Sequence, residues 1–435
     1  MNDLFHGLAF TPADLLLPRN CDLKRWSVVA CDQYTAQPEY WQRVAEFVGT
    51  APSTLALVLP ESCLDGPNVG TDIVEVNNNM TRYLREDRFQ PIQNAMIYVE
   101  RRLRGGGVRR GLVGKLDLER YDYETGAQSL IRSTEGVVPA RIPPRVAVRK
   151  NARLELSHVM VLVDDPEAWL FDPLTAAKDR MEKLYDFSLM EDGGHLTGWK
   201  LDEEALAQVA SALRRLEDPK TFRSRYGQSQ PMAYAVGDGN HSLATAKAYW
   251  EELKPTLSPE QRANHPARWC LAEVCNVRSD AVEIEPIHRV LFNTSYETVL
   301  LNLVTWSDEN MAGVRFGDEY EQKMQLIGVQ EECTLSFENP TAPLGVGTVD
   351  EFVEYFLENH PEARVDYVHD EAAVRAFSAE KGAVGLLLPP LQKSDLFRGV
   401  VLGGVLPRKT FSMGHAEEKR YYIECRRIAE QGSPR

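Results

Sequence analysis

Long hydrophobic runs are missing from this chain of 435 residues. No stretch approaches the ~18 consecutive apolar residues of a membrane-spanning helix, and the first residues show no cationic segment followed by an apolar one. The seven cysteines are odd in number and scattered, which disfavours a disulfide framework and a zinc site built on close cysteine pairs. We therefore expect a cytoplasmic protein with reduced thiols and no membrane span.

Positive charge is also scarce. The chain has 49 Lys and Arg residues but 64 Asp and Glu residues, so its formal net charge is −15. Duplex nucleic acid and anionic membranes both attract basic surfaces, so this balance disfavours direct binding to either. A small phosphorylated ligand is compatible with the balance, since a local basic pocket is enough to bind it. Hydrophobic residues at 43% and charged residues at 26% are typical of a globular protein.

The predicted fold class is α+β, with mixed sheets and flanking helices, because strands and helices do not alternate regularly and no internal repeat is visible. Helical spacing of apolar residues predicts one helix over residues 38–48 and another within residues 166–187. Two apolar stretches separated by three glycines predict a β-hairpin or meander over residues 94–121.

The length of the chain indicates more than one domain. Prolines gather shortly before residue 150, where they interrupt regular structure. We therefore predict an N-terminal α+β domain over residues 1–150 and a C-terminal α+β domain over residues 151–435.

The sharpest local signal is the stretch VGDGNHSLATAK, in which a strand ends, glycines flank Asp238 and a helix starts near Ser242. Glycine allows a ligand to approach the backbone, and the first turn of a helix offers N–H groups to an anion. Asp238 could bind Mg²⁺ or accept a proton, and His241 could donate to a phosphoryl oxygen. Neither dinucleotide-binding nor Walker A spacing is present, and a plain strand–helix turn is the alternative interpretation.

Other segments carry residue types that suit phosphate chemistry. Residues 132–149 concentrate arginines, which bind phosphates bidentately, although a solvated connection is the alternative. His288 and Arg289 follow a proline, where a structural histidine is the alternative. Lys409 is a candidate phosphate ligand near the end of the chain. Asp32 follows a short apolar strand and is a candidate general base, with a capping role as the alternative.

Taken together, these segments resemble the family named domain of unknown function 1015, over most of the chain. The family's Asp-Gly-His-His-Arg string is matched by residues 238–242 (DGNHS), and its Pro-x-His-Arg string by residues 286–289 (PIHR). Its closing Pro-x-Lys-Ser-Thr string is approximated by residues 407–411, and its Thr-Glu segment by residues 133–135. Only Asp32 agrees with its early Pro-Tyr-Asp string.

Two residues depart from the family's main string. Asn240 replaces its first histidine, and Ser242 replaces its arginine. A guanidinium group is therefore missing from the predicted phosphate site, and Arg289 or Arg132 would have to substitute for it.

The same string is similar to one in the ParB/sulfiredoxin-like superfamily, where it binds nucleotide phosphates at a helix N-terminus. One branch of that superfamily is an ADP-dependent kinase of free serine. The resemblance implies a ParB/sulfiredoxin-like core around residues 238–242, with ADP or ATP and Mg²⁺ as cofactors. It also implies a phosphotransferase or phosphatase acting between a nucleotide or water and a small hydroxy amino acid such as serine or phosphoserine. A nucleotide- or phosphate-binding regulatory module without catalysis is the alternative.

The resulting site hypothesis needs its residues to converge in one pocket, because phosphoryl transfer depends mainly on positioning and charge neutralisation. The predicted catalytic residues are His241, Asp238, Asp32 and Glu135, with Asp238 also as the metal ligand. The predicted phosphate- and substrate-binding residues are Gly237, Gly239, Asn240, Ser242, Arg132, Thr134, His288, Arg289 and Lys409. The expected partner is a small phosphorylated molecule, without direct contact to nucleic acid or membrane.

Overall fold

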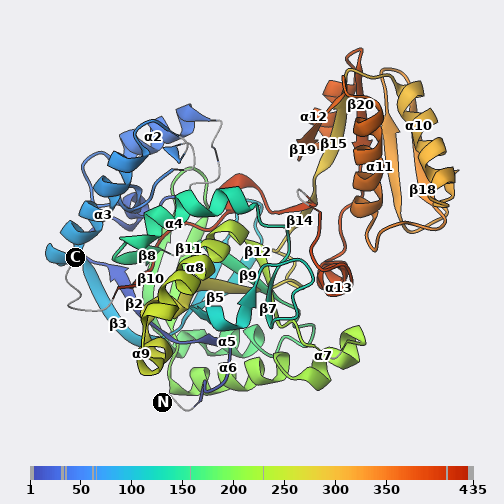
Figure 1. The fold of residues 1–435 in the computed structure, drawn as a ribbon. Helices are drawn as coiled ribbons and strands as arrows, with labels where there is room; N and C mark the ends of the chain where they lie inside the picture. Colours follow the sequence, from blue (N-terminus) through green and yellow to red (C-terminus); the bar gives the residue numbers. More distant parts are fainter. Residues whose placement is uncertain are drawn as a thin grey trace. The chain divides into compact units, whose positions relative to one another are not determined.

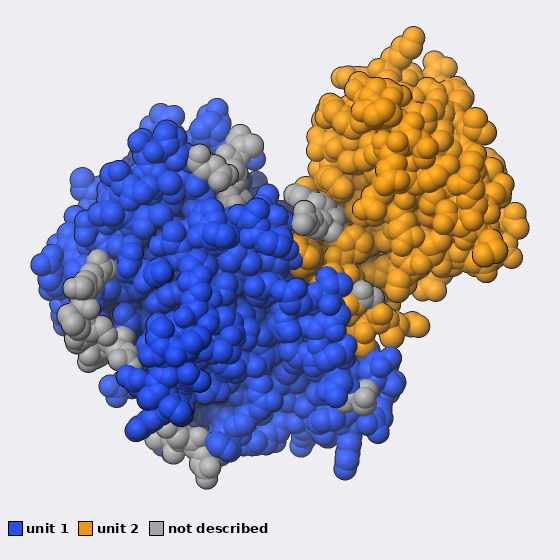
Figure 2. Space-filling view, viewed as in Figure 1, with its two compact units in different colours: residues 1–133, 137–282, 415–435 blue, residues 134–136, 283–414 orange. Residues whose placement is uncertain are grey.

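The computed structural model divides into two compact units, which Figure 2 shows in different colours. The described residues are 4–30, 34, 37–60, 63–64, 66–156, 158–228, 230–407 and 410–429. The first unit comprises Met1–Ser133, Val137–Val282 and His415–Arg435, and the second comprises Thr134–Gly136 and Glu283–Gly414. The predicted α+β class, with mixed sheets and flanking helices, is confirmed.

The first unit is built on a large mixed sheet with the strand order β10-β11-β4-β5-β13-β9-β12-β7-β6 (Figure 1). β13 runs parallel to β9 and β12 runs parallel to β7, whereas β9 and β12 are antiparallel. The strands are β4 (Ile97–Arg102), β5 (Val108–Asp117), β6 (Tyr121–Asp122), β7 (Ile131–Ser133), β9 (Val159–Val163), β10 (Glu182–Ser188), β11 (His195–Lys200), β12 (Tyr234–Asp238) and β13 (Trp269–Asn276), with β1 (Phe10–Thr11) paired to β5.

Pairing within this sheet explains why the compact units do not divide at residue 150, where the sequence places a domain boundary. Strand β5 precedes that position and β13 follows it by more than a hundred residues, yet the two pair over Gly111–Asp117 and Trp269–Cys275. A boundary at residue 150 would separate these hydrogen-bonded neighbours. The units divide instead at residues 133–137, 282 and 414.

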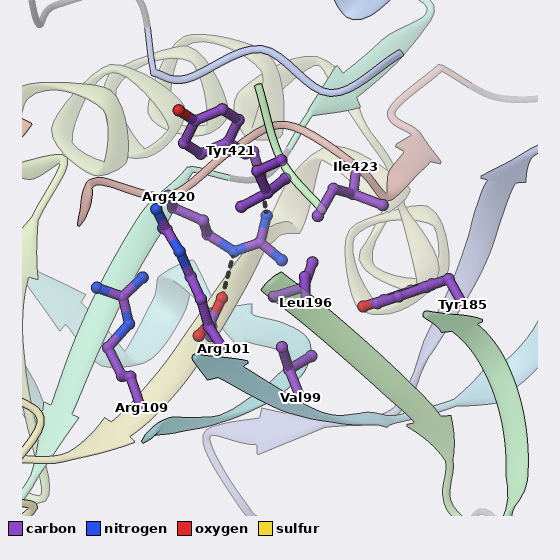
Figure 3. Close-up of a pocket in the computed structure, with 10 residues that line it drawn as sticks. Val99, Arg101, Arg109, Tyr185, Leu196, Arg420, Tyr421 and Ile423 are labelled. Carbon is purple, nitrogen blue, oxygen red and sulfur yellow. Dashed lines mark hydrogen bonds and ion pairs between the residues drawn. The ribbon is translucent and has the colours of Figure 1, made fainter. Parts of the chain in front are cut away.

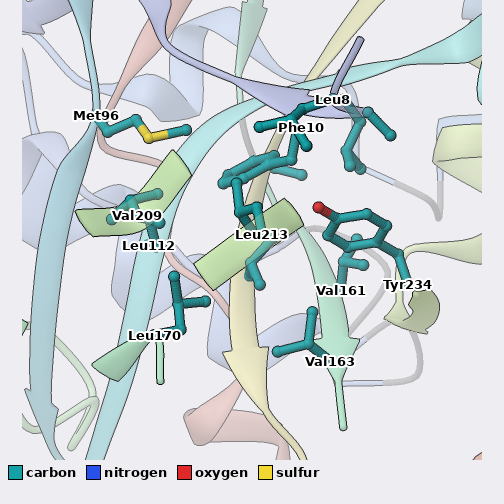
Figure 4. Close-up of a cluster of buried hydrophobic side chains, with 14 of the residues drawn as sticks. Leu8, Phe10, Met96, Leu112, Val161, Val163, Leu170, Val209, Leu213 and Tyr234 are labelled. Carbon is teal, nitrogen blue, oxygen red and sulfur yellow. The ribbon is translucent and has the colours of Figure 1, made fainter. Parts of the chain in front are cut away.

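The two faces of the sheet carry different side chains. On one face, Val161 and Val163 of β9 pack with Leu213 of a helix in a single apolar cluster (Figure 4). Successive residues of a strand point to opposite faces. Met160 of β9 is paired with Glu273 of β13 and with Asp238 of β12, so all three lie on the other face. The helices of the first unit are α1 (Leu23–Trp26), α2 (Pro38–Val48), α3 (Val69–Arg85), α4 (Ile142–Lys150), α5 (Phe171–Ala177), α6 (Glu203–Leu216), α7 (Pro219–Tyr226), α8 (Asn240–Leu253) and α9 (Pro259–Asn264).

A smaller sheet completes the first unit and joins distant parts of the chain. Its strand order is β3-β2-β22-β8, so the last strand of the chain pairs with strands from its beginning and middle. Its strands are β2 (Ala13–Pro18), β3 (Phe89–Ala95), β8 (Leu154–Leu156) and β22 (Cys425–Arg427).

Several predicted elements of the first unit can be compared with this structure. The helix predicted over residues 38–48 is α2, and the predicted hairpin is the antiparallel pair of β4 and β5. The prediction of a helix within residues 166–187 is correct for α5 but wrong for residues 182–187. Those residues belong to β10, because they pair along their length with β11.

The second unit contains a six-stranded sheet with the order β16-β18-β17-β20-β15-β19. Leu303, Phe352 and Leu386 belong to its apolar core. Its elements are β14 (Ile284–Pro286), β15 (His288–Phe292), α10 (Tyr296–Glu309), β16 (Val314–Phe316), β17 (Lys323–Ile327), β18 (Glu332–Phe337), α11 (Gly345–Asn359), β19 (Arg364–Val368), α12 (Glu371–Ser378), β20 (Ala383–Leu387), α13 (Lys393–Gly403) and β21 (Phe411–Met413). Across the described parts of both units, every helix is too short or too polar to cross a membrane.

A partly buried carboxyl group links the N-terminal segment to the apolar core of the first unit. Glu217, directly after α6, accepts hydrogen bonds from the backbone N–H of Ala9 at 3.0 Å and from the hydroxyl of Tyr234 at 2.8 Å. Burial raises the pKa of this carboxyl group from 4.5 to about 7, because an apolar environment disfavours the charged form.

Replacing Glu217 should therefore change how stability depends on pH. The folded state binds the Glu217 proton more tightly than the unfolded state, so the free energy of unfolding should fall as pH rises from about 4.5 to about 7. Glu217→Gln should remove this part of the slope in urea denaturation, whereas Glu203→Gln, at an exposed position of α6, should keep it. An unchanged slope in E217Q would contradict the assignment.

Candidate functional site

The turn between β12 and α8 depends on Gly239. Its backbone φ is +83°, a conformation that strains any residue with a Cβ atom. A Cβ atom at this position would also lie only 3.2 Å from the Cα of Val159 in β9. The helix begins directly afterwards at Asn240, and glycine at the N-cap has no side chain that could cap its first turn.

The carboxyl group of Asp238 lies beside an ammonium group. Its Oδ1 accepts a hydrogen bond from the N–H of Gly239 at 3.1 Å, and its Oδ2 lies 3.8 Å from Nζ of Lys419. Only 14% of the Asp238 side chain and 7% of the Lys419 side chain are exposed. The described residues place no set of three metal-ligating side chains around Asp238. Lys419 therefore supplies positive charge where the sequence predicts Mg²⁺, and this pair does not fit a resident metal ion.

Two imidazole rings lie at the first turn of α8. Nε2 of His241 accepts a hydrogen bond from the backbone N–H of Val138 at 3.2 Å, so the neutral ring carries its proton on Nδ1. Nε2 of His158, just before β9, lies 2.8 Å from Oγ of Ser242. The ring of His158 meets that of Tyr422 edge to face, at 5.3 Å between ring centres. The turn is thus surrounded by groups that can exchange protons.

Buried arginines fix the C-terminal segment of residues 415–427 that carries Lys419. Arg101 of β4 donates to the carbonyls of Glu417 at 2.5 Å and Lys419 at 2.7 Å. Arg109 of β5 donates to the carbonyl of Glu418 at 2.7 Å. Burial and the positive charge of Arg109 lower the pKa of Arg101 to about 9. The backbone on both sides of Lys419 is therefore bonded to the sheet.

Carboxyl groups bind the next arginine of this segment. Arg420 lies 2.6 Å from Glu273 of β13 and 2.7 Å from Glu424. Tyr185 of β10 donates to Glu424 at 2.5 Å. Figure 3 shows Arg420 beside Arg101 and Tyr421, and its ion pair with Glu273 is among the interactions marked by dashed lines. All of these groups are buried, so the position of the segment is tightly determined.

A short extended stretch near the N-terminus pairs with the same segment. The N–H of Ala30 donates to the carbonyl of Arg420 at 3.0 Å, and the N–H of Tyr422 donates to the carbonyl of Val28 at 2.8 Å. Asp32 follows Ala30 in the sequence, but Asp32 and Lys409 lie outside the described residues. Their assigned roles stay predictions.

Arg132 lies on β7, where it is paired with Ala235 of the neighbouring strand β12. It is buried, and its guanidinium donates to the carbonyls of Ser129 at 2.8 Å and Gln230 at 3.4 Å. Burial lowers its pKa below the ordinary value. Within the described residues its bonding partners are neutral, so its positive charge is not matched by a bonded carboxylate.

His288 and Arg289 have partners inside the second unit. Nδ1 of His288 accepts a hydrogen bond from the N–H of Leu388 at 3.1 Å, and burial lowers the pKa of His288. The guanidinium of Arg289 is fully buried and makes two hydrogen bonds to Asp350, at 2.7 and 2.8 Å. Their assignment to phosphate and substrate binding stays a prediction.

Thr134 and Glu135 also belong to the second unit, although they directly follow β7. The carbonyl of Thr134 accepts a hydrogen bond from the N–H of Leu406 at 2.7 Å, and Glu135 forms an isolated parallel bridge with Leu406. Thr134 is buried and Glu135 is partly buried. Their assignment to substrate binding and catalysis stays a prediction.

His158 and Lys419 are two residues at the turn that the sequence does not single out. His158 is a single histidine before an apolar strand, and nothing in its surroundings indicates the contact with Ser242. Lys419 lies in the stretch HAEEKRYYIECRR over residues 415–427, whose density of charged and aromatic residues is a signal that was available.

The model of the family described as "Protein of unknown function (DUF1015)" matches residues 14–365. The chain belongs to this family. The match confirms the resemblance seen in the strings of the sequence, and it spans residues of both compact units. No curated protein sequence matches the chain.

Comparison of this DUF1015 protein with solved structures gives matches of low similarity. A free serine kinase in complex with AMP has 10% identity over 71% of this chain and 90% of its own, with a TM-score of 0.35. A conserved hypothetical protein from Pyrococcus furiosus has 9% identity over 72% and 94%, with a TM-score of 0.33. SbnI with a C-terminal truncation, from Staphylococcus aureus, has 9% identity over 69% and 82%, with a TM-score of 0.35.

The role of Gly239 can be tested by comparing two glycine substitutions. Gly227 also has a positive φ, +70°, but no heavy atom lies within 4 Å of a Cβ atom placed there. Gly227→Ala should therefore cost only backbone strain, about 1–2 kcal/mol of unfolding free energy. Gly239→Ala adds the clash with Val159 and should cost about 1–3 kcal/mol more, measured by urea denaturation. If the two variants lose the same unfolding free energy, the close contact between the turn and Val159 does not contribute to stability.

Proposed function

We propose that the Asp238–Ser242 turn binds a phosphate group and that the protein transfers a phosphoryl group between a nucleotide, or water, and the hydroxyl of a small amino acid such as serine. The observation that supports this is the gathering of Lys419, His158 and His241 at the first turn of α8. An ammonium group, imidazole donors and the positive end of a helix are the groups that bind phosphate in proteins. The nucleotide and the amino acid come from the family resemblance of the strings.

Lys419 is the proposed main source of positive charge. Its Nζ lies 3.8 Å from Oδ2 of Asp238, at the first turn of α8. Asp238 positions the ammonium group through charge, and its second oxygen stabilises the turn through the N–H of Gly239. No step is assigned to a metal ion on Asp238.

His241 is the proposed proton donor to a phosphoryl oxygen. The bond from Val138 to Nε2 orients the ring and leaves the proton on Nδ1, the nitrogen that we assign to the substrate. Asp32 and Glu135 stay our proposed candidates for orienting the attacking hydroxyl or water. Gly237, Gly239 and Asn240 would let a phosphate approach the backbone closely.

Arg132 is the proposed substitute for the arginine that the family string has at position 242. It lies on the strand beside β12, it is buried, and it is bonded to backbone carbonyls. A bound phosphate would give this guanidinium the anionic partner that the described residues do not bond to it.

A regulatory module that binds a nucleotide or phosphate without catalysis is the second candidate function. The departures at Asn240 and Ser242 favour it, because they replace the first histidine and the arginine of the family string. Oγ of Ser242 is moreover bonded to His158, which suits a structural role of this hydroxyl.

A variant of His241 distinguishes these functions. Wild-type protein should convert ADP or ATP and serine to phosphoserine, or release phosphate from phosphoserine, followed by ³¹P NMR. His241→Gln should lower that rate by about 10²–10⁴, the usual contribution of a positioned proton donor, with an unchanged melting temperature. His195→Gln, at the surface of β11, should keep the full rate.

Two further outcomes would contradict the proposed roles or favour the regulatory module over phosphoryl transfer. Full activity of H241Q would remove His241 from the mechanism. Nucleotide binding by wild-type protein in calorimetry, without phosphate transfer or release under any of these conditions, would establish the regulatory module instead.

A further inference from the structure

The first unit contains a cavity apart from the Asp238–Ser242 turn. Its volume is about 410 Å³, within the usual range of ligand pockets. It lies between strands of the smaller sheet, the loop before β13 and β5, and it shares no residue with the Asp238–Ser242 turn. Its walls include Leu16, Ile92, Lys115, Pro266, Trp269 and Arg426.

Lys115 of β5 contributes an ammonium group to this cavity. Nζ lies 4.7 Å from the ring centre of Trp269, over its face. Within the described residues no carboxylate lies at ion-pair distance from Lys115. The nearby Asp117 binds Arg268 at 2.6 Å, and Asp14 accepts a hydrogen bond from the N–H of Asn94 at 2.8 Å.

The other charges of the wall leave the cavity positive. Arg426 and Arg427 line it together with Lys115, against the single carboxylate of Asp14. Glu155, behind the wall, lies 3.0 Å from Arg426 but is also bonded to Arg149, so one carboxylate serves two arginines. A positive cavity is notable in a chain with a net charge of −15.

The remaining wall combines apolar and polar groups. Leucine, isoleucine and proline residues of β2, β3 and the loop before β13 line the cavity together with Trp269, and the amides of Gln93 and Asn264 add polar groups. The guanidinium of Arg268 also lies over the ring of Trp269, at 5.3 Å from its centre. Such a wall suits a ligand with a compact apolar body, while the cationic groups suit an anionic head.

We propose that this cavity binds a small organic anion, with a carboxylate or phosphate monoester bonded to Lys115 and an apolar body against Trp269. The site is independent of the function proposed for the Asp238–Ser242 turn. Burial, followed by the positive charge of Arg426, lowers the pKa of Lys115 to about 8. An anion in the cavity would compensate both effects, so binding should stabilise the protonated amine.

Calorimetry of the full chain near neutral pH tests the proposal, with benzoate and phenyl phosphate as the probes. Benzyl alcohol, which has the same ring without charge, should not bind. Lys115→Met should weaken binding of the better anion at least tenfold, whereas Lys220→Met, at an exposed position of α7, should leave it unchanged. The stronger of the two probes identifies the anionic head group as a carboxylate or a phosphate.

The pH dependence gives a second, separate measurement. The charged groups facing Lys115 are Asp14 of β2, Asp117 of β5, Arg268 before β13 and Arg426 of β22, and none of these titrates near pH 8 in its ordinary range. Affinity of wild-type protein should fall about tenfold for each pH unit above about 8, because the anion requires the protonated amine. Lys115→Arg should retain its affinity over the same range, since the guanidinium stays charged.

Two results would overturn the proposal. One is that neither benzoate nor phenyl phosphate binds at millimolar concentration, and the other is that K115M binds the better anion with wild-type affinity. If K115M does not fold, trinitrobenzenesulfonate labelling of wild-type protein at a pH near 8 decides. The better anion should protect Lys115 in the peptide map, and equal labelling with and without it would refute the site.

Discussion

The candidate site depends on three buried arginines, two from the sheet and one from the C-terminal segment, which hold that segment in place. A guanidinium group placed inside a protein must replace the hydrogen bonds that it loses with water, because burying an uncompensated charge is very costly. Arg101 meets this requirement with backbone carbonyls, and Arg420 meets it with Glu273 and Glu424. Arg109 donates to the carbonyl of Glu418, while its buried Nε has no hydrogen-bond partner among the described residues. Together these bonds hold the path of the segment across the sheet. Lys419, in the middle of that path, is thereby brought to Asp238.

The large sheet of the first unit positions the carboxyl groups that meet the C-terminal segment. The face opposite the apolar cluster carries Glu273, Met160 and Asp238 in one paired row across β13, β9 and β12. Glu273 anchors the segment by binding Arg420, and Asp238 meets the lysine that precedes this arginine. Asp238 therefore belongs both to the turn before α8 and to a charged layer between the sheet and the end of the chain. A change in the buried arginines would act on the turn without touching it.

Local features of the fold could be read from the sequence, and features that depend on distant pairing could not. Helix α2 shows its apolar spacing directly, and the hairpin of β4 and β5 is marked by three glycines between two apolar stretches. Within residues 166–187 the sequence predicts only a helix, and β10 is a strand because it pairs with β11 along its length. The division into units likewise follows from β5 and β13, which are adjacent in space and remote in sequence.

The sequence by itself determined the turn: glycines around Asp238, a histidine in the first helical turn, and strings that identify the family. These are properties of neighbouring residues, and short-range geometry is enough to interpret them. Only the tertiary structure decided which charges meet there. It placed Lys419 and His158 at the turn, and it gave Arg289 a buried partner in the second unit. Such contacts depend on the register of paired strands and on the path of a buried charged segment. The spacing of residues along the chain does not reveal either of these.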